Sequence, residues 1–221
     1  ILFRELHHRV RNNLNIIRSI VSLQARRSKD PAFSRAAEAL GGRIMSVSFV
    51  FERLYRTAEL AEIVLDGYID DLAGAICMGT PWTGAGPQPR VDVFADRVMI
   101  DLDMAVPLGL VINELLVNSL RHATVPGVLL SVRIGAKQTG SMLELEVVDN
   151  GPGYPLLPGS GKTDMKRMPE LFRESMGMTL VALMLEQLNG DGFVVRENGF
   201  TRCSLTFPVS TRSTLPEPGR V

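Results

Sequence analysis

The first predicted helix begins in a stretch that holds two of the three histidines of the chain, Glu5-Leu6-His7-His8-Arg9-Val10-Arg11-Asn12-Asn13-Leu14-Asn15. Successive residues of an α-helix are about 100° apart, so the direction of each side chain can be predicted. Apolar residues between Leu2 and Val21 fall within an arc of roughly 120°, which indicates a core-facing stripe. His8 lies nearly opposite the middle of that arc, and His7 lies at its edge. We therefore expect His8 to face solvent or a partner, although an ordinary solvated residue explains this stretch alone equally well.

A second long helix is predicted directly after the first, which should end near Ser28. Asp30-Pro31 is typical of an N-cap followed by proline at the first helical position, and apolar residues then recur every three or four positions up to Leu54. Two long helices joined by a turn of a few residues form an antiparallel hairpin. Such a hairpin buries one face of each helix, so we expect it to pair with a second copy in a four-helix bundle. A monomer remains the alternative if the hairpin packs against the rest of its own chain.

Composition and charge limit the class of protein. The chain has 221 residues, of which 45% are hydrophobic, enough for a sizeable core in one or two domains. Its net charge is zero, but residues 1–62 hold 11 Lys and Arg against six Asp and Glu (+5), and the remainder holds 13 against 18 (−5). This asymmetry predicts that the first part meets an acidic surface or nucleic acid.

The predicted location is cytoplasmic. Cys77 and Cys203 are far apart in apolar surroundings, which favours free thiols over a disulfide. The sequence shows no signal peptide and no apolar run of membrane-spanning length. It begins with Ile1 inside a helical pattern, so we expect a fragment of a longer protein, with any sensory or membrane part upstream.

From about residue 62 the pattern becomes one of short strands and helices. We expect helices over 66–78, 104–121 and 176–187, and strands over 90–95, 98–102, 128–136, 142–148, 192–197 and 201–207. Asn198-Gly199 should form the tight turn between the last two strands. The prediction is an α+β fold with helices on one face of a mixed sheet. Its domains are a helical hairpin over 1–62, an α+β domain over 63–208 and a disordered tail over 209–221.

One polar cluster lies on the predicted helix over 104–121, in the segment 113–122. Glu114, Asn118 and Arg121 recur at spacings of four and three, so they should share one polar face. Carboxylate and amide oxygens on one face suit Mg²⁺, which takes few protein ligands and completes its shell with phosphate and water. Taken alone, the cluster is more often a solvent-facing stripe.

Two further clusters come at the ends of regular elements. Asp149-Asn150-Gly151-Pro152-Gly153 directly follows an apolar strand, where a carboxylate and close-approaching glycine backbone could hold a flat heterocycle with an exocyclic amine. Ser175-Met176-Gly177-Met178 opens a helix and could offer backbone N–H groups to an anion. Each is a weak signal alone, because turns and helix starts commonly contain glycine.

Together these clusters and the opening helix resemble a sensor histidine kinase of the HWE-like branch. Asn113–Ala123 is similar to the N box of the GHKL ATP-binding fold, which kinases share with gyrase-type ATPases and heat-shock-protein-90 chaperones. Asp149–Gly153 and Ser175–Met178 are similar to its two glycine boxes. His7-His8-Arg9-Val10-Arg11-Asn12 resembles the H box, whose phospho-acceptor is the histidine directly before arginine, His8. The resemblance implies a dimerisation and phosphotransfer hairpin followed by an α/β-sandwich ATP-binding domain.

The resemblance also implies roles for individual residues. Asn118 would hold Mg²⁺ against the phosphates of ATP, and Asp149 would accept a hydrogen bond from the adenine amino group. Glu114 replaces the first asparagine of the commoner N box and is the candidate for orienting His8 or a metal-bound water. The remaining implied contacts are to the nucleotide and its phosphates, from Gly151, Gly153, Gly177, Arg121 and His122.

In such a kinase the phosphoryl group passes from His8 to an aspartate of a response regulator, and the hairpin forms a homodimer. Two alternatives belong to other classes. A GHKL ATPase or phosphotransfer adaptor would lack autokinase activity, but an adaptor typically has a decayed nucleotide site, whereas Asn118, Asp149 and Gly153 are intact. A nucleic-acid-binding module would use the basic first helix, but those arginines flank a histidine on a helix expected to pair with another helix. We therefore expect no nucleic-acid partner.

Overall fold

The structure is a computed structural model that describes residues 2–56, 62–80, 82, 87–154, 161–171 and 176–209. Within the first two helices it describes side chains from Arg9 to Phe51, and in the next strand side chains from Ile63 onward. The side chains of His7 and His8, all of Ser175 and the predicted tail from residue 210 therefore lie outside the described residues.

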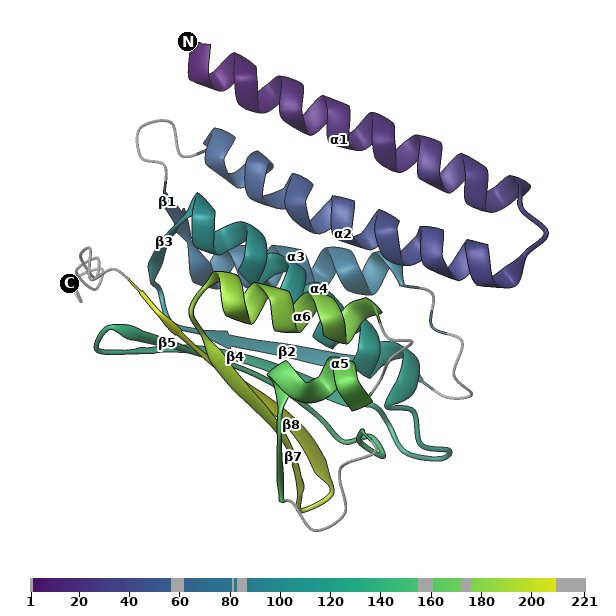
Figure 1. Ribbon diagram of the computed structural model, residues 1–221, viewed down its shortest axis with the longest axis vertical. Helices are drawn as coiled ribbons and strands as arrows, with labels where there is room; N and C mark the ends of the chain where they lie inside the picture. The colour runs from purple at the N-terminus through teal and green to yellow at the C-terminus, as the bar shows by residue number, and fades with distance from the viewer. Residues whose placement is uncertain are drawn as a thin grey trace.

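The first two helices form the predicted antiparallel hairpin. Helix α1 spans Leu2–Arg27 and helix α2 spans Pro31–Arg56. Asp30 ends the connecting turn, and its Oδ1 accepts a hydrogen bond from the Ala32 amide at 2.8 Å, as expected of an N-cap. Helix α1 is the outermost element, and α2 lies between α1 and the rest of the chain (Figure 1). The C-terminal half of α2, up to the buried Val50, is thus covered by the same chain, whereas Phe33 and Leu40 nearer its start are exposed.

A six-stranded sheet forms the base of the second part, in the order β2-β4-β5-β8-β7-β6. Strand β2 pairs parallel with β4, and the other neighbours are antiparallel, so the sheet is mixed as predicted. The strands span Arg90–Ala95 (β2), Ser131–Thr139 (β4), Met142–Asp149 (β5), Lys162–Asp164 (β6), Asp191–Glu197 (β7) and Phe200–Pro208 (β8). At the β7–β8 turn Asn198 and Gly199 have φ values of 52° and 81°, as a tight two-residue hairpin requires.

A smaller sheet joins the two parts. Strand β1 (Glu62–Val64) pairs antiparallel with β3 (Met99–Asp101). The strand predicted over 98–102 therefore belongs to this separate sheet.

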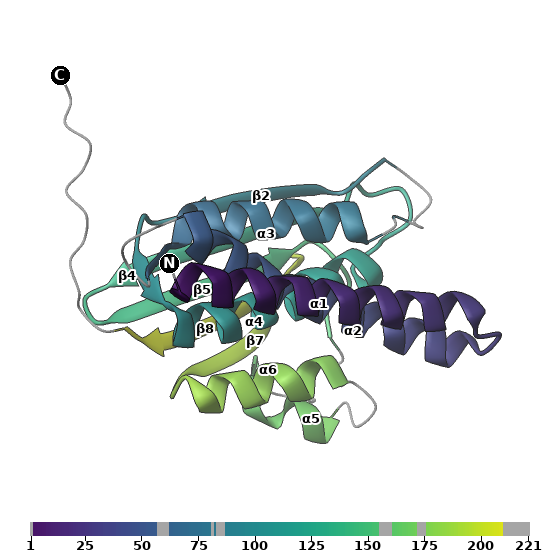
Figure 2. The same ribbon diagram turned by 90° about the horizontal axis from the view of Figure 1, so that it is seen from above.

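The helices of the second part lie on one face of the large sheet (Figures 1 and 2). They are α3 (Leu65–Gly79), α4 (Leu102–His122), α5 (Met168–Leu171) and α6 (Met176–Gln187), with a 3-10 turn at Met165–Arg167. Alternate residues of β4, such as Val132 and Ile134, are buried beneath them. The α+β prediction is confirmed.

Helix α4 forms the centre of this core. Leu108, Ile112 and Leu116 are fully buried, and the Tyr68 hydroxyl of α3 donates to the Ala105 carbonyl oxygen at 3.1 Å. By length and composition alone α4 could cross a membrane, but 67% of its most apolar window is buried inside the protein. Its apolar character is therefore explained by its place in the core.

Candidate functional site

The carboxylate of Asp149 lies at the end of β5, buried against α4. The Ser119 hydroxyl donates to its Oδ2 at 2.7 Å, and the Gly151 amide donates to its Oδ1 at 2.9 Å. Helix α4, which carries the segment similar to the N box, and the loop after β5 thus fix the side chain from two sides. Hydrogen bonds to a buried carboxylate satisfy it and hold its direction. The position suits recognition of one specific hydrogen-bond donor.

Two glycines allow the backbone after Asp149 to pass close to its neighbours. A Cβ built on Gly151 would lie 2.4 Å from Ala123 Cβ at the end of α4, so only glycine fits there. Gly153 has a φ of +84°, which favours glycine, and a Cβ there would lie 3.1 Å from Thr201 Oγ1. These glycines bring the loop against α4 and β8, and their contact with a nucleotide stays a prediction.

Thr201 supplies a polar atom beside Asp149 that the sequence analysis missed. The two residues are direct partners in the β5–β8 register. Thr201 Oγ1 is buried, and it has no hydrogen-bond partner in the part of the chain that the structure describes. Buried polar atoms normally have a partner, so this hydroxyl is suited to a ligand or an ordered water. A carboxylate and an unsatisfied hydroxyl side by side fit the edge of an adenine ring.

Asn118 of α4 contacts Tyr154, another residue that the sequence analysis missed. The Tyr154 hydroxyl is hydrogen-bonded to Asn118 and lies close to Cys203 and Asp149. Burial, together with these neighbours, raises the pKa of Tyr154 well above its ordinary value of 10.0, although the Asn118 hydrogen bond opposes the shift. Burial likewise raises the pKa of Cys203, to about 12. Both groups are therefore neutral at physiological pH.

Glu114 points away from this group, toward the hairpin. Its carboxylate forms a two-point ion pair with Arg43 of α2, Nε to Oε1 at 2.9 Å and Nη2 to Oε2 at 2.9 Å. Asn113 Nδ2 also donates to Oε1, at 3.1 Å. The ion pair is largely buried, with side-chain exposures of 15% for Arg43 and 9% for Glu114. The shared polar face expected from the sequence is therefore divided, because Glu114 contacts α2 while Asn118 contacts Tyr154.

Arg121 and His122 end α4 and are both exposed. Arg121 Nη2 lies 3.4 Å from Glu38 Oε2, a second link to α2. Arg121 and Glu114 line a cleft of about 680 Å³ between the hairpin and the ends of α3 and α4, which we call the hairpin cleft. Arg18 and Arg26 of α1 line its opposite side. The hairpin cleft is thus rich in charged groups from both parts of the chain.

Gly177 is the second residue of α6 and is half-buried. The residue before it, Met176, also contacts the hairpin, since Arg43 Nη1 lies 3.4 Å from its sulfur atom. The start of α6 therefore lies next to α2, as Glu114 does.

Within the ranges that the structure describes, no three His, Cys, Asp or Glu side chains gather as a metal site. Asn118 on α4 is the residue expected from the sequence to hold Mg²⁺, and that role stays a prediction.

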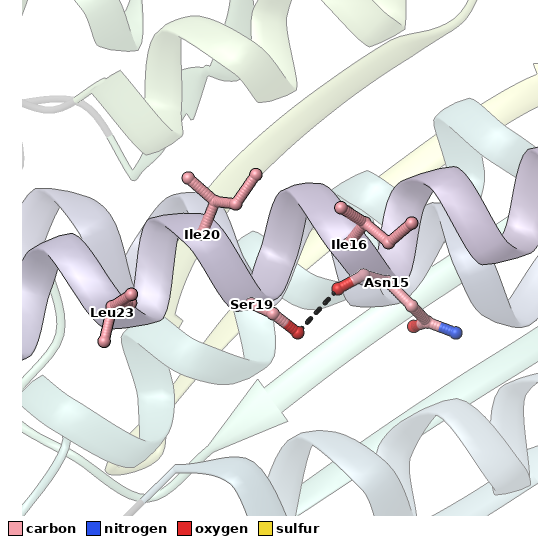
Figure 3. A pocket seen from close by; sticks show the side chains of 5 residues that line it. All are labelled: Asn15, Ile16, Ser19, Ile20 and Leu23. Atoms are coloured by element: carbon pink, nitrogen blue, oxygen red, sulfur yellow. Dashed lines mark hydrogen bonds between the residues drawn. The ribbon is translucent and has the colours of Figure 1, made fainter.

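The outer face of α1 carries a shallow groove of about 340 Å³ (Figure 3). It is lined by Asn15, Ile16, Ser19, Ile20 and Leu23. Ile16, Ile20 and Leu23 are 58%, 54% and 50% exposed, and Ile17 beside them is 48% exposed. The stripe predicted as core-facing is therefore only partly covered, since Ile17 and Ile20 face outward.

Two family models match the chain. Residues 5–79 match a model described as histidine kinase, and residues 104–211 match one described as histidine kinase-, DNA gyrase B-, and HSP90-like ATPase. These segments correspond to the hairpin with α3 and to the domain from α4 to β8.

Curated relatives include sensor histidine kinases. The sensor histidine kinase PdtaS of Mycobacterium tuberculosis is 30% identical over 216 residues, 96% of this chain and 40% of the relative. The blue-light-activated histidine kinase 2 of Erythrobacter litoralis is 26% identical over 219 residues, 96% of this chain and 58% of the relative. The chain thus spans about 40% to 58% of the length of these relatives.

Solved structures with the same fold span both parts of the chain. The histidine kinase domain of the Erythrobacter litoralis EL346 blue-light activated histidine kinase has a TM-score of 0.63 at 24% identity, covering 93% of this chain and 89% of that one. Full-length ShkA in complex with AMPPNP has a TM-score of 0.53 at 17% identity, covering 95% of this chain and 46% of that one. These likenesses support the arrangement of a helical hairpin followed by an α/β domain.

Proposed function

The chain belongs to the histidine kinases, and on that premise we propose that it uses ATP to phosphorylate its own His8 and passes the phosphoryl group to an aspartate of a response regulator. The observation that carries the proposal is the fixed Asp149 carboxylate beside the Thr201 hydroxyl, which has no hydrogen-bond partner among the described residues. This pair is a ready-made site for the edge of an adenine ring. A phosphotransfer adaptor without kinase activity would have no use for it.

Asp149 and Thr201 would hold the adenine end of ATP. Asp149 would accept a hydrogen bond from the exocyclic amine, while Ser119 and the Gly151 amide keep the carboxylate in place. Gly153 would allow close approach of the backbone. ATP supplies the γ-phosphoryl group that is transferred.

The phosphate end would be served by the end of α4 and the start of α6. Asn118 would hold Mg²⁺ against the phosphates, and Arg121 and His122 would neutralise their charge. Gly177 would offer its backbone N–H at the start of α6. Positioning and charge neutralisation provide most of the catalysis of phosphoryl transfer.

His8 would act as the nucleophile. One ring nitrogen attacks the γ-phosphorus in line, the bond to the β–γ bridging oxygen breaks, and ADP leaves with that electron pair. The assignment to His8 rather than His7 rests on the helical phase of α1 and on the resemblance to the H box. Domain boundaries near residues 62 and 208 remain part of the same proposal.

We infer a homodimer formed through α1. The C-terminal half of α2 packs against the catalytic part of its own chain (residues 62–208), and the outer face of α1 exposes Ile16, Ile20 and Leu23 together, so we assign this face to the second copy. Ile16→Glu together with Ile20→Glu should convert a dimer into monomers in sedimentation analysis.

Free thiols at Cys77 and Cys203 support a cytoplasmic location.

Phosphorylation with γ-labelled ATP and Mg²⁺ tests the central proposal. The protein should acquire label that is stable in base and labile in acid, as expected of phosphohistidine. His8→Ala should abolish labelling, and the matched variant His7→Ala should retain much of it. If His7 proves necessary and His8 dispensable, the assignment is wrong. Release of inorganic phosphate without labelled protein would instead indicate an ATPase.

A further inference from the structure

Arg43 of the hairpin contacts two helices of the catalytic part. Its guanidinium contacts the N-box helix through Glu114, with two atom pairs at 2.9 Å, and the first residue of α6 through the sulfur of Met176 at 3.4 Å. One side chain of α2 therefore ties together both helices that border the proposed phosphate end of the site.

The backbone of α2 is shaped to allow this contact. Gly42, next to Arg43, lies against Asn113, and a Cβ built on Gly42 would be 3.3 Å from Asn113 Oδ1. That distance is tighter than ordinary van der Waals contact, so a larger side chain at residue 42 would push α2 away from α4. The absence of a side chain at Gly42 thus allows α2 to approach α4 closely enough for the Arg43–Glu114 ion pair.

The Glu114 carboxylate is directed at α2 while this contact is made. Arg43 donates to both of its oxygens, and Asn113 donates to Oε1 as well. A buried ion pair is strongly destabilised when one partner is removed, because the other charge is left without compensation. If α2 moved away, water would replace Arg43 as the hydrogen-bond partner of Glu114.

The contact also fixes where the catalytic part sits along the hairpin. The α1 residues that line the hairpin cleft together with Glu114 and Arg121 run from Arg18 to Arg26. His8 precedes Arg18 by ten residues, about 15 Å along the helix axis. In-line transfer needs the reacting atoms about 3 Å apart. With this contact made, Glu114 and Arg121 therefore lie level with Arg18–Arg26 of α1 and not with His8 of the same chain.

We propose that Arg43 is an interdomain latch, which pairs with Glu114 to hold the kinase in a closed state and must release it before His8 can be phosphorylated. The inference rests on the proposed function, because it assigns a control element to that same site. Release frees the Glu114 carboxylate and allows the catalytic part to move along the hairpin at the same time.

Hydrogen–deuterium exchange measures the latch without reference to activity. In the 221-residue chain, Arg43→Gln should speed exchange of amides in the α2 segment around Gly42 and in the facing segment of α4. Glu38→Gln is the matched control, because it removes only the exposed 3.4 Å contact to Arg121 and should leave exchange unchanged. Arg43→Gln/Glu114→Gln should restore slow exchange, since the pair is then neutral and no charge is left buried alone.

Labelling with γ-labelled ATP measures the consequence. Arg43→Gln should raise the initial rate of His8 phosphorylation about tenfold, as expected when a closed population opens, with ATP affinity unchanged. Gly42→Leu, which leaves Arg43 and Glu114 intact, should open the contact sterically and raise the rate in the same direction.

The outcomes separate this inference from the proposed function. Unchanged exchange in Arg43→Gln would overturn the latch. Faster exchange with an unchanged or lower phosphorylation rate would overturn its inhibitory role. If the unaltered chain and every variant fail to label while still binding ATP, the proposed function and the inhibitory role fail together, and the exchange data alone decide whether Arg43 holds the two parts closed.

Discussion

Asp149, packed against α4, and Glu114, on α4, are both buried carboxylates, but the charged partner of Glu114 comes from another part of the chain. Asp149 is held by Ser119 and by the Gly151 amide, both within the catalytic part. Glu114 is held by Arg43, which lies 71 residues earlier, in the hairpin. The environment of Asp149 is therefore set as soon as the catalytic part folds, whereas that of Glu114 also depends on where the hairpin lies.

This difference separates recognition from control. A nucleotide site built from strand, loop and N-box helix keeps its shape when the hairpin moves. A carboxylate that relies on a residue of another domain changes its environment with every such movement. ATP binding should then be insensitive to changes in the hairpin and sensitive to small changes around Asp149.

Asp149→Asn should have the largest effect on ATP binding. It replaces the acceptor facing the adenine amine by a group that can present an N–H, which would leave buried donors facing each other. We expect the Kd for AMPPNP with Mg²⁺ to rise at least about 100-fold in isothermal titration calorimetry, roughly 2.7 kcal/mol. Glu144→Gln, on the exposed side of the same strand, is the control. An unchanged Kd in Asp149→Asn would mean that Asp149 does not bind the adenine amine. The contrast drawn between Asp149 and Glu114 would then not hold.

Gly151→Ala should disturb the loop after Asp149 by steric overlap. The added methyl group would lie 2.4 Å from Ala123 Cβ, so the loop or the end of α4 must shift. Overpacking of this kind costs about 1–3 kcal/mol, which should appear as a lower Tm. ATP affinity should fall as well, because the Gly151 amide would no longer hold Asp149. Gly161→Ala, whose added methyl group would meet no described residue within 4 Å, should leave both unchanged, and an equal loss in the two variants would contradict the steric explanation.

Ser119→Ala should weaken ATP binding more mildly. It removes the 2.7 Å hydrogen bond to Asp149 Oδ2 and leaves that oxygen without its protein donor. The expected loss is about 1–2 kcal/mol, near tenfold in Kd. Ser48→Ala is the matched control, because Ser48 is also buried but its hydroxyl donates to the Ile44 carbonyl oxygen within α2. If both variants bind ATP equally well, Ser119 does not support the site.

Local patterns were enough to predict most regular elements. Helix α6 spans the predicted residues 176–187, and the tight turn lies at Asn198-Gly199, as predicted. Apolar periodicity and turn chemistry act over a few residues, so a single sequence reveals them. Strands β1 and β6 were not predicted and have three residues each, although β3, equally short, was predicted within the segment 98–102.

Contacts between distant residues were the part that the sequence could not predict. Nothing local indicates that Arg43 would pair with Glu114, or that Thr201 would lie opposite Asp149 in the sheet. The first depends on how two domains meet, and the second on the register of two strands far apart in the chain. Glu114 was predicted as a site residue, but its partner could come only from the structure. The roles of His8, Asn118 and Gly177 stay predictions.

The smallest expected effect concerns Cys203, which lies close to Tyr154 and Asp149. It tests whether the surroundings of Asp149 are formed entirely within the catalytic part. Its pKa rises from 9.0 to about 12 on folding, mainly through burial, so the unfolded thiol loses its proton at a pH where the folded thiol keeps it. Its contribution to stability is complete below pH 9 and is lost progressively as the pH rises toward 12. Urea unfolding of the unaltered chain should therefore give a lower free energy at pH 10 than at pH 8. In Cys203→Ala that fall should be smaller by about 1 kcal/mol, whatever the substitution costs at pH 8. Equal falls in the two proteins would mean that Cys203 reaches solvent and that this end of the site opens more readily than the comparison implies.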